Sequence, residues 1–175
     1  AFDFNDFTTT TTDSYSIIGG VGPAGTGQAR VEESVSHTDV AGEDDSESHT
    51  DSTVTYTYVT STAIVQTAAG QSHTTGADAF DFNLFDTTTT DTYERIGDTG
   101  QMRVVLSASV TDVTGADGSH SHTISAVTYT YDEEARIASA AGTSSTTGTD
   151  AFDFNDFTTT TTDSYSIIGG VGPAG

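Results

Sequence analysis

The chain has 175 residues, of which 33% are hydrophobic, and it carries 26 acidic against 4 basic residues, a net charge of −22. So few apolar side chains exclude a large hydrophobic core, and the acidic excess argues against binding to nucleic acids. Because cysteine and lysine are both absent, disulfides and lysine–asparagine isopeptide crosslinks are excluded as covalent staples.

The first 25 residues, AFDFNDFTTTTTDSYSIIGGVGPAG, return without change at 151–175. Residues 1 and 151 therefore occupy the same place in a period of 150 residues. Self-similarity at a fixed period is the signature of repeat architectures. We expect the chain to be a window from a longer tandem array, in which 151–175 starts the next repeat.

The period itself divides into two related half-units, 1–78 and 79–150. The segment AFDFNDFTTTTTDSY at 1–15 returns as AFDFNLFDTTTTDTY at 79–93. The halves differ mainly by five residues that are missing from the glycine-rich stretch of the second half. A length change at such a stretch is typical of a surface loop between fixed elements.

Turn residues alternate with segments of about 12 residues that are rich in Thr, Val, Ile and Tyr. Within these segments the residues alternate, as where Val127, Tyr129 and Tyr131 point one way while Thr128 and Thr130 point the other. No segment has a helical period. The strands predicted, in chain order, are 7–18, 29–40, 46–58, 63–75, 85–96, 102–114, 119–131 and 136–146.

The sequence therefore predicts an all-β fold: an antiparallel meander of long strands in tandem repeats that forms an extended fibre or a spiral β-sheet. A four-stranded half-unit alone would leave two unpaired edges, which invite pairing with another strand. In a tandem array the next unit supplies that strand. We expect the partners of this chain to be neighbouring copies of the same repeat, in the same chain or in a polymer.

Aspartate-rich turns are the candidate metal sites. They contain oxygen ligands of the kind that Ca²⁺ takes in sets of six to eight, and the best candidates are Asp44, Asp45 and Asp117. No turn matches a complete calcium-loop signature, and Asp and Gly are also ordinary turn residues. We therefore expect no cofactor, with Ca²⁺ left open.

The threonine tracts at 8–12, 87–90 and 158–162 have three interpretations. The tracts could form an ordinary strand surface, a set of O-glycosylation sites or an ice-binding face. A flat ice-binding sheet needs the same Thr-x-Thr in strand after strand, whereas in the sequence the tracts recur once per half-unit. Ordinary strand surface is therefore the interpretation we favour.

His120 and His122, in SHSH, fall on one side of a predicted strand and could share a zinc ion. The first half has Glu47 and His49 at the matching positions, so the pair does not recur, and we favour a solvated hairpin surface. No cysteine, lysine or G-x-S-x-G motif is present, and Ser, His and Asp are spread along repeated strands. We therefore expect no catalytic residues and no enzyme activity.

Paired phenylalanines follow each TGxD turn, with Asp and Asn at the alternate positions. They are interpreted as anchors that pin the strand start to a layer beneath, with a carbohydrate-stacking platform as the alternative. These residues are Phe2, Phe4, Phe80, Phe82, Phe152 and Phe154.

The segment VTYTYDEEARIASAAGT at 127–143 resembles the YD repeat of Rhs-type proteins: Tyr-x-Tyr-Asp, two residues, Gly-Arg-Leu, then a polar strand. The matching residues are Tyr129, Tyr131, Asp132, Arg136 and Ile137, with Ala135 in place of glycine. The resemblance implies a secreted or surface-exposed bacterial protein whose β-hairpins wind into a spiral sheet, which encloses a cargo in Rhs-type proteins. The long, unvarying period is more similar to the giant tandem-repeat surface proteins that use the motif for length.

The function we expect is that of a structural extracellular filament or surface fibre, with a role in adhesion, as a stalk or in a matrix. Two alternatives stay open: a repeat adhesin that binds glycans or Ca²⁺, and a toxin-encapsulating YD-repeat shell. The expected location is extracellular, at the cell surface. No apolar run approaches the roughly 18 residues of a membrane span.

Overall fold

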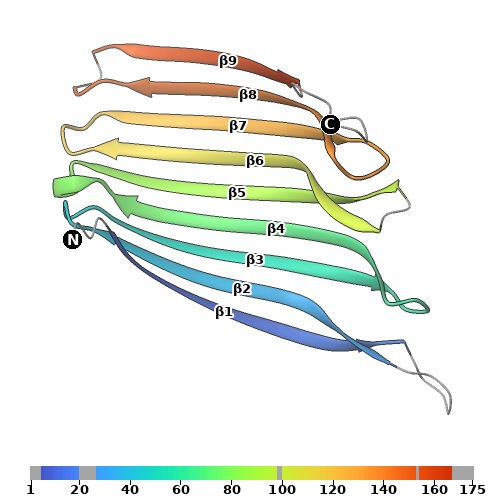
Figure 1. Ribbon diagram of the computed structural model, residues 1–175. Coiled ribbons are helices and arrows are strands. Elements are labelled where there is room, and N and C mark those ends of the chain that lie inside the picture. Colours follow the sequence, from blue (N-terminus) through green and yellow to red (C-terminus); the bar gives the residue numbers. More distant parts are fainter. Residues whose placement is uncertain (1–4, 20–26, 98–99, 153, 167–175) are drawn as a thin grey trace, which may run out of the picture.

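The computed structural model describes residues 5–19, 27–97, 100–152 and 154–166, which form a single antiparallel sheet of nine strands. The strands follow one another across the sheet in chain order (Figure 1). They are β1 (Asn5–Ile18), β2 (Gln28–Gly42), β3 (Glu47–Val59), β4 (Ile64–Ala77), β5 (Asn83–Ile96), β6 (Gln101–Gly115), β7 (His120–Tyr131), β8 (Ile137–Thr149) and β9 (Asp156–Ser166). One turn of 3-10 helix, η1 (Ala79–Asp81), joins β4 to β5.

The predicted antiparallel meander of long strands is confirmed, and each of the eight expected segments overlaps a strand of the sheet. The turns explain where the strands end. Asp45 and Gly118 have φ of 65° and 85° in the β2–β3 and β6–β7 turns, a left-handed region that Gly and Asp tolerate. The glycine-rich loop expected at 19–27 lies mostly outside the described residues.

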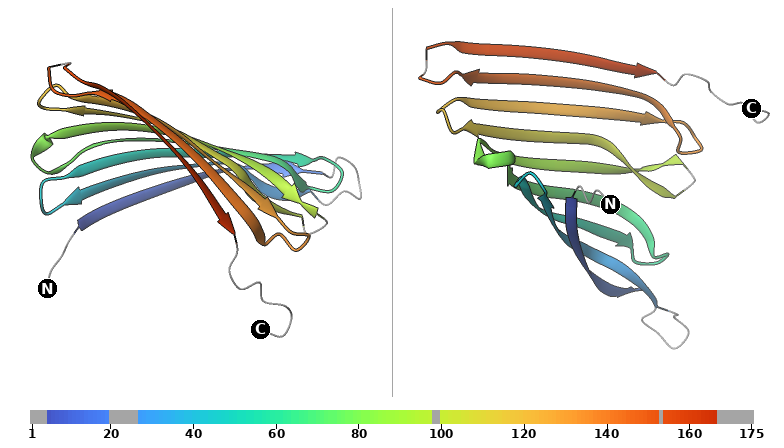
Figure 2. Two further views of the ribbon diagram at one scale, coloured as in Figure 1. Left: turned by 90° about the horizontal axis from the view of Figure 1, so that it is seen from above. Right: turned by 60° about the vertical axis from the view of Figure 1, so that its left-hand side comes forward.

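Each of the hairpins β1–β2, β3–β4, β5–β6 and β7–β8 has one β-bulge near the start of its second strand. The residues left without a partner are Glu32, Gln66, Val105 and Ala138. Tyr58 donates its hydroxyl to the carbonyl of Val31, and Tyr131 donates to the carbonyl of Val104 at 2.6 Å, directly before two of these bulges. Bulges increase the right-handed twist of a sheet, and this sheet is visibly twisted (Figure 2).

The sheet is a single layer without a second layer against either face (Figure 2). Its accessible surface is 11581 Å², whereas a compact protein of this mass exposes roughly 8,100 Å². The buried hydrophobic residues among those described are four alanines, Ala63, Ala68, Ala77 and Ala135. Backbone hydrogen bonds and cross-strand pairs, rather than a core, therefore hold the described part of the chain together.

The links between half-units are held by an aspartate–asparagine pair. Asp78 accepts hydrogen bonds from the backbone and side chain of Asn83, at 2.8 and 2.5 Å. Asp150 accepts from the backbone and side chain of Asn155 in the same way, at 3.1 and 2.6 Å. Within the described residues, no helix is long and apolar enough to cross a bilayer.

The interpretation of the paired phenylalanines as buried anchors is wrong for the four that the structure describes. Phe80, Phe82, Phe152 and Phe154 are 85%, 53%, 81% and 80% exposed. They have no layer beneath them to pack against, because the sheet is single, and the aspartate–asparagine pairs fix the link instead. Phe2 and Phe4 lie outside the described residues.

Candidate functional site

One face of the sheet carries hydroxyl groups in unbroken rows, and we call it the hydroxyl face. Successive side chains of a strand point to opposite faces of the sheet, and residues that lie directly opposite each other on neighbouring strands point to the same face. A threonine from each of the nine strands lies in one row: Thr9, Thr38, Thr50, Thr74, Thr87, Thr111, Thr123, Thr146 and Thr159. The adjacent row, from Thr11 to Thr161, contains only Ser and Thr.

Hydrogen bonds between hydroxyls link neighbouring strands on this face. Threonine pairs bridge the hairpins, as between Thr50 and Thr74 at 3.0 Å and between Thr87 and Thr111 at 3.0 Å. Ser36 and Ser52 bridge β2 to β3 at 2.7 Å. The rows thus add cross-strand side-chain bonds to the backbone ladder, which is how paired Thr and Ser stabilise sheets.

The Thr-x-Thr tracts recur once per half-unit, as the sequence indicates, and lie on β1, β5 and β9. Every strand contributes a hydroxyl pair, and the register that aligns the pairs was not visible in the sequence. However, the sheet twists along its whole width (Figure 2), so the rows do not form the flat plane that ice binding requires.

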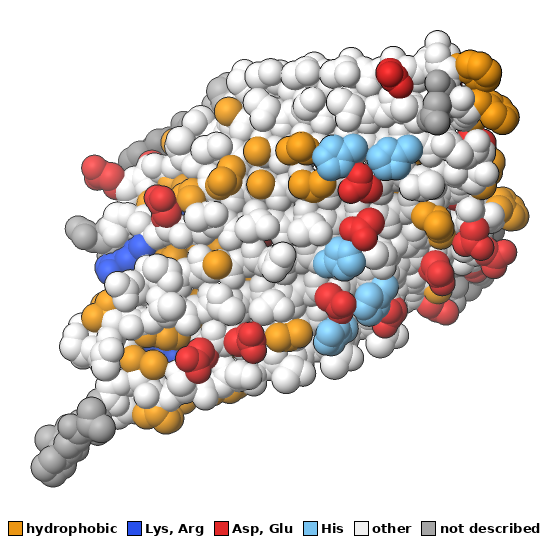
Figure 3. All heavy atoms as spheres, turned by 180° about the vertical axis from the view of Figure 1, so that it is seen from behind, with side chains coloured by type: hydrophobic (Ala, Val, Ile, Leu, Met, Phe, Trp, Pro, Cys, Tyr) orange, Lys and Arg blue, Asp and Glu red, His pale blue; other side chains and the backbone are white. Residues whose placement is uncertain are grey.

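The opposite face carries all five histidines of the chain, and we call it the histidine face. Histidines and aspartates alternate there in a band that crosses β2 to β7 (Figure 3). The members of this His–Asp band are His37, Asp39, His49, Asp51, His73, Asp86, Asp112, His120 and His122. Each histidine in the band has a carboxylate partner within 4 Å.

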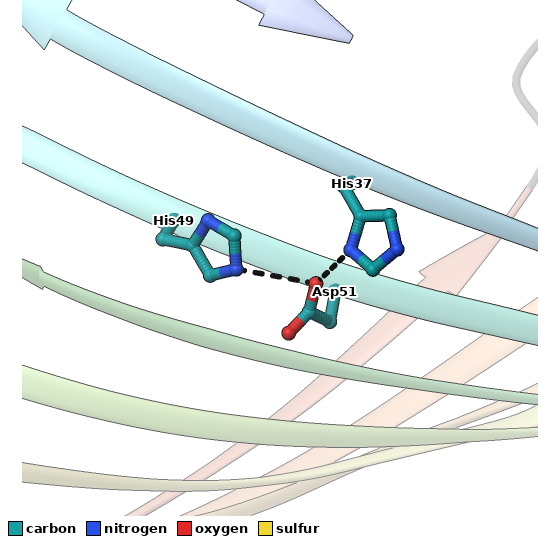
Figure 4. Close-up of side chains that lie close together, drawn as sticks. All are labelled: His37, His49 and Asp51. Atoms are coloured by element: carbon teal, nitrogen blue, oxygen red, sulfur yellow. Dashed lines mark hydrogen bonds and ion pairs between the residues drawn. The ribbon is translucent and has the colours of Figure 1, made fainter. Parts of the chain in front are cut away.

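Three members of the band converge at the β2–β3 hairpin (Figure 4). His37 and Asp51 lie directly opposite each other, and His37 Nδ1 contacts Asp51 Oδ1. His49, two residues before Asp51 on β3, places its Nε2 3.2 Å from the same oxygen. The two imidazole rings stack with their centroids 6.5 Å apart.

A fourth residue, Asp39, holds the ring of His49 from its other side. Asp39 Oδ1 lies 2.6 Å from His49 Nδ1. Hydrogen bonds to Asp39 and then Asp51 raise the pKa of His49 above its usual 6.5. The hydrogen bond with His37 lowers the pKa of Asp51 below its usual 3.8.

The corresponding hairpin of the second half-unit, β6–β7, keeps only part of this arrangement. Asp112 and His122 repeat the pair Asp39 and His49, with 2.7 Å between Asp112 Oδ1 and His122 Nδ1. Val110 and Ile124 lie opposite each other where the first half-unit has His37 and Asp51. His120, which the sequence paired with His122, lies with its Nε2 3.7 Å from Asp112 Oδ1.

A shallow hollow of 660 Å³ lies beside His49 on the histidine face. Its charged lining is acidic apart from that histidine. The carboxylates are Asp6, Asp39, Glu47, Asp81, Asp86 and Asp112. A concave surface lined by one sign of charge concentrates the opposite ion, so this region attracts cations.

The predicted calcium candidates lie in two separate turns. Asp44 and Asp45 are in the β2–β3 turn and Asp117 is in the β6–β7 turn, with β4 and β5 between the two hairpins. Asp44 accepts hydrogen bonds from the backbone and hydroxyl of Ser46, at 3.1 and 2.6 Å. Asp117 accepts from the backbone of Ser119 at 2.9 Å. Hydrogen bonds from the side chain and then the backbone of Ser46 lower the pKa of Asp44, and those from the side chain and then the backbone of Ser119 lower the pKa of Asp117. These bonds account for both aspartates as turn formers.

The β7–β8 turn shows what the Tyr-Asp segment does locally. Asp132 Oδ1 accepts hydrogen bonds from the backbone of Glu134 and Arg136, at 3.1 and 2.9 Å, and Asp132 Oδ2 accepts from Arg136 Nε at 2.8 Å. Ala135, where the motif has glycine, takes a left-handed φ of 62°. Glycine suits that position because it has no Cβ to clash.

Sequence reasoning missed the cluster of His37, His49 and Asp51. It considered His120 and His122 because they are neighbours in the chain, whereas the cluster joins residues from two strands. A signal did exist, since His37 and Asp51 each lie seven residues from Asp44 at the centre of the turn.

Comparison with known proteins gives no relative from which a function can be transferred. No protein-family model, no curated protein and no solved structure matches the chain.

Proposed function

We propose that this chain is a segment of a structural extracellular filament or surface fibre, in which tandem β units extend one sheet and serve adhesion, a stalk or a matrix. The observation that carries the proposal is the state of the two sheet edges. β1 and β9 lie at opposite edges (Figure 1), and within the described residues neither has a strand, helix or loop across its outer side.

The phenylalanine at one position of the repeat occurs in both edge strands, which have one neighbouring strand, and in an interior strand, which has two. Phe7 on β1 is 76% exposed and Phe157 on β9 is 44% exposed. Their counterpart Phe85, on β5 between two strands, is only partly exposed. An added strand at either edge would therefore bury aromatic surface, and burial of apolar surface favours association.

The junction between repeats supports continuation of the sheet. Phe85 of β5 pairs with Gly76 of β4, and Phe157 of β9 pairs with Gly148 of β8 in the same register. β9 has the sequence of β1, so its outer edge matches the edge that β1 presents to β2. A following unit would add its strands to β9 without any new kind of contact.

Electron microscopy of chains with one, two and four consecutive copies of the 150-residue period tests this function. Each period contributes the eight strands β1–β8, so we expect ribbons that lengthen by roughly 38 Å per copy at a strand spacing of about 4.8 Å. Rounded particles, or closed shells whose length does not increase with copy number, would contradict the filament.

A further inference from the structure

The ligand atoms of His37, His49 and Asp51 are close enough together to share one ion. One ligand atom from each of these side chains lies within 4.8 Å of the other two, and His49 Nε2 is 3.2 Å from Asp51 Oδ1. Ligands about 2.0–2.1 Å from a tetrahedral ion are about 3.3 Å from each other. Small side-chain movements are therefore enough to surround an ion.

Asp39 prepares His49 for such a role. The Nδ1–H of His49 donates to Asp39 Oδ1 at 2.6 Å, which leaves the lone pair on Nε2 toward Asp51. A carboxylate on the far nitrogen of a ligating histidine fixes its tautomer and raises its basicity, and such partners are typical of metal sites. The third histidine nearby, His73, is engaged with Asp86 at 2.9 Å.

The donor set selects the class of ion. Imidazole nitrogens suit zinc, copper and nickel, whereas Ca²⁺ and Mg²⁺ prefer oxygen ligands alone. The side chains of His37, His49 and Asp51 are about half exposed, at 52%, 48% and 48%, so an ion reaches them directly from solvent. Three protein ligands leave the fourth position of a tetrahedral ion for water.

We propose that His37, His49 and Asp51 bind one Zn²⁺-type divalent ion, with Asp39 as the positioning residue for His49. The site is a property of the first half-unit only. In the second, Val110 and Ile124 occupy the places of His37 and Asp51, although Asp112 and His122 are kept. The chain thus contains its own matched control, a hairpin with the same register but without two of the three ligands.

The experiment is calorimetric titration of the 175-residue chain with Zn²⁺ and separately with Ca²⁺. We expect one equivalent of Zn²⁺ to bind at the β2–β3 hairpin and Ca²⁺ not to compete. The variant H37V/D51I installs the cross-strand pair that the second half-unit already tolerates. H37V/D51I should weaken Zn²⁺ binding by more than about 100-fold, because it removes two ligands and not only a residue that hydrogen-bonds a ligand. D39N should weaken it by about tenfold.

The reverse exchange, V110H/I124D, rebuilds all four residues in the β6–β7 hairpin. It should add a second equivalent of Zn²⁺. H120A, a histidine of the same band outside the cluster, should leave the first equivalent unchanged. Circular dichroism checks that each variant keeps its sheet, and the gain of a site by V110H/I124D cannot arise from unfolding.

Electron paramagnetic resonance of bound Cu²⁺ gives an independent readout, because two imidazole nitrogens split the signal in the parent chain. The assignment is overturned if H37V/D51I still binds one equivalent with unchanged affinity, if V110H/I124D gains none, or if the parent chain binds Ca²⁺ at this hairpin in place of Zn²⁺.

Discussion

The two half-units, β1–β4 and β5–β8, have the same order of strand pairing, the same bulges and the same threonine rows, and two of their differences bear on stability and on metal binding. The first half-unit has a free edge at β1, whereas β5 is covered on both sides by β4 and β6. The first also has His37 opposite Asp51 where the second has Val110 opposite Ile124. The strand pairing is thus the same whichever side chains the sheet exposes at these positions. We expect the stability of each strand to depend on whether it has one neighbouring strand or two.

The largest loss of stability should come from substitution of the glycines that lie opposite phenylalanines on the next strand. A Cβ on Gly76 would lie 2.3 Å from the carbonyl of Glu47 and 2.4 Å from the ring of Phe85. Because β5 is held on both sides, we expect Gly76→Ala to lower the free energy of unfolding by about 2–3 kcal/mol. Urea denaturation measures this loss.

Gly148→Ala is the matched variant in the second half-unit. The added Cβ would lie 2.4 Å from the carbonyl of His120 and 2.6 Å from the ring of Phe157. Detachment of the edge strand β9 relieves the clash with Phe157 but not the one with His120 on β7, so the global loss should be smaller than at Gly76, about 1 kcal/mol. Equal losses at the two glycines would mean that edge and interior strands are held alike.

Removal of a tyrosine hydroxyl should have a smaller effect. Tyr131→Phe leaves the carbonyl of Val104 beside the β5–β6 bulge without the hydroxyl donor, and we expect a loss of about 1 kcal/mol. Tyr58→Phe does the same at Val31, next to the free edge, where water replaces the donor more easily. Its loss should be smaller, and urea denaturation of the two variants compares them.

The smallest effect concerns protonation at the β2–β3 hairpin. The raised pKa of His49 means that its imidazolium stabilises the fold fully below its usual 6.5 and that this contribution is lost as pH rises through the folded value. The depressed pKa of Asp51 gives the opposite dependence, since its contribution is present above 3.8 and is lost as pH falls further.

Nuclear magnetic resonance titration of the His49 ring checks this assignment. We expect an inflection above 6.5 in the parent chain and a downward shift in D39N, because Asp39 is the largest cause of the raised pKa. An inflection that D39N leaves in place would show that Asp39 does not hold the ring in solution.

The fold could be predicted from the sequence because each strand is marked locally. Alternating Thr, Val and Tyr identify strands such as β7, and GEDD and GADG identify the turns that end β2 and β6. The exposure of Phe80 and Phe152 could not be predicted, since it depends on whether a second layer exists. The threonine rows and the His37–Asp51 contact depend on register between strands, which a reading of one strand at a time does not contain.

The central claim is that an equivalent strand closes each free edge. It is tested most directly by amide hydrogen exchange on the 175-residue chain and on the same chain extended by a second copy of residues 26–78. We predict that the extension protects the β9 amides that face outward, around Phe157, to the level of the matching β5 amides around Phe85. Exchange at β9 that stays as fast as in the shorter chain would contradict the account.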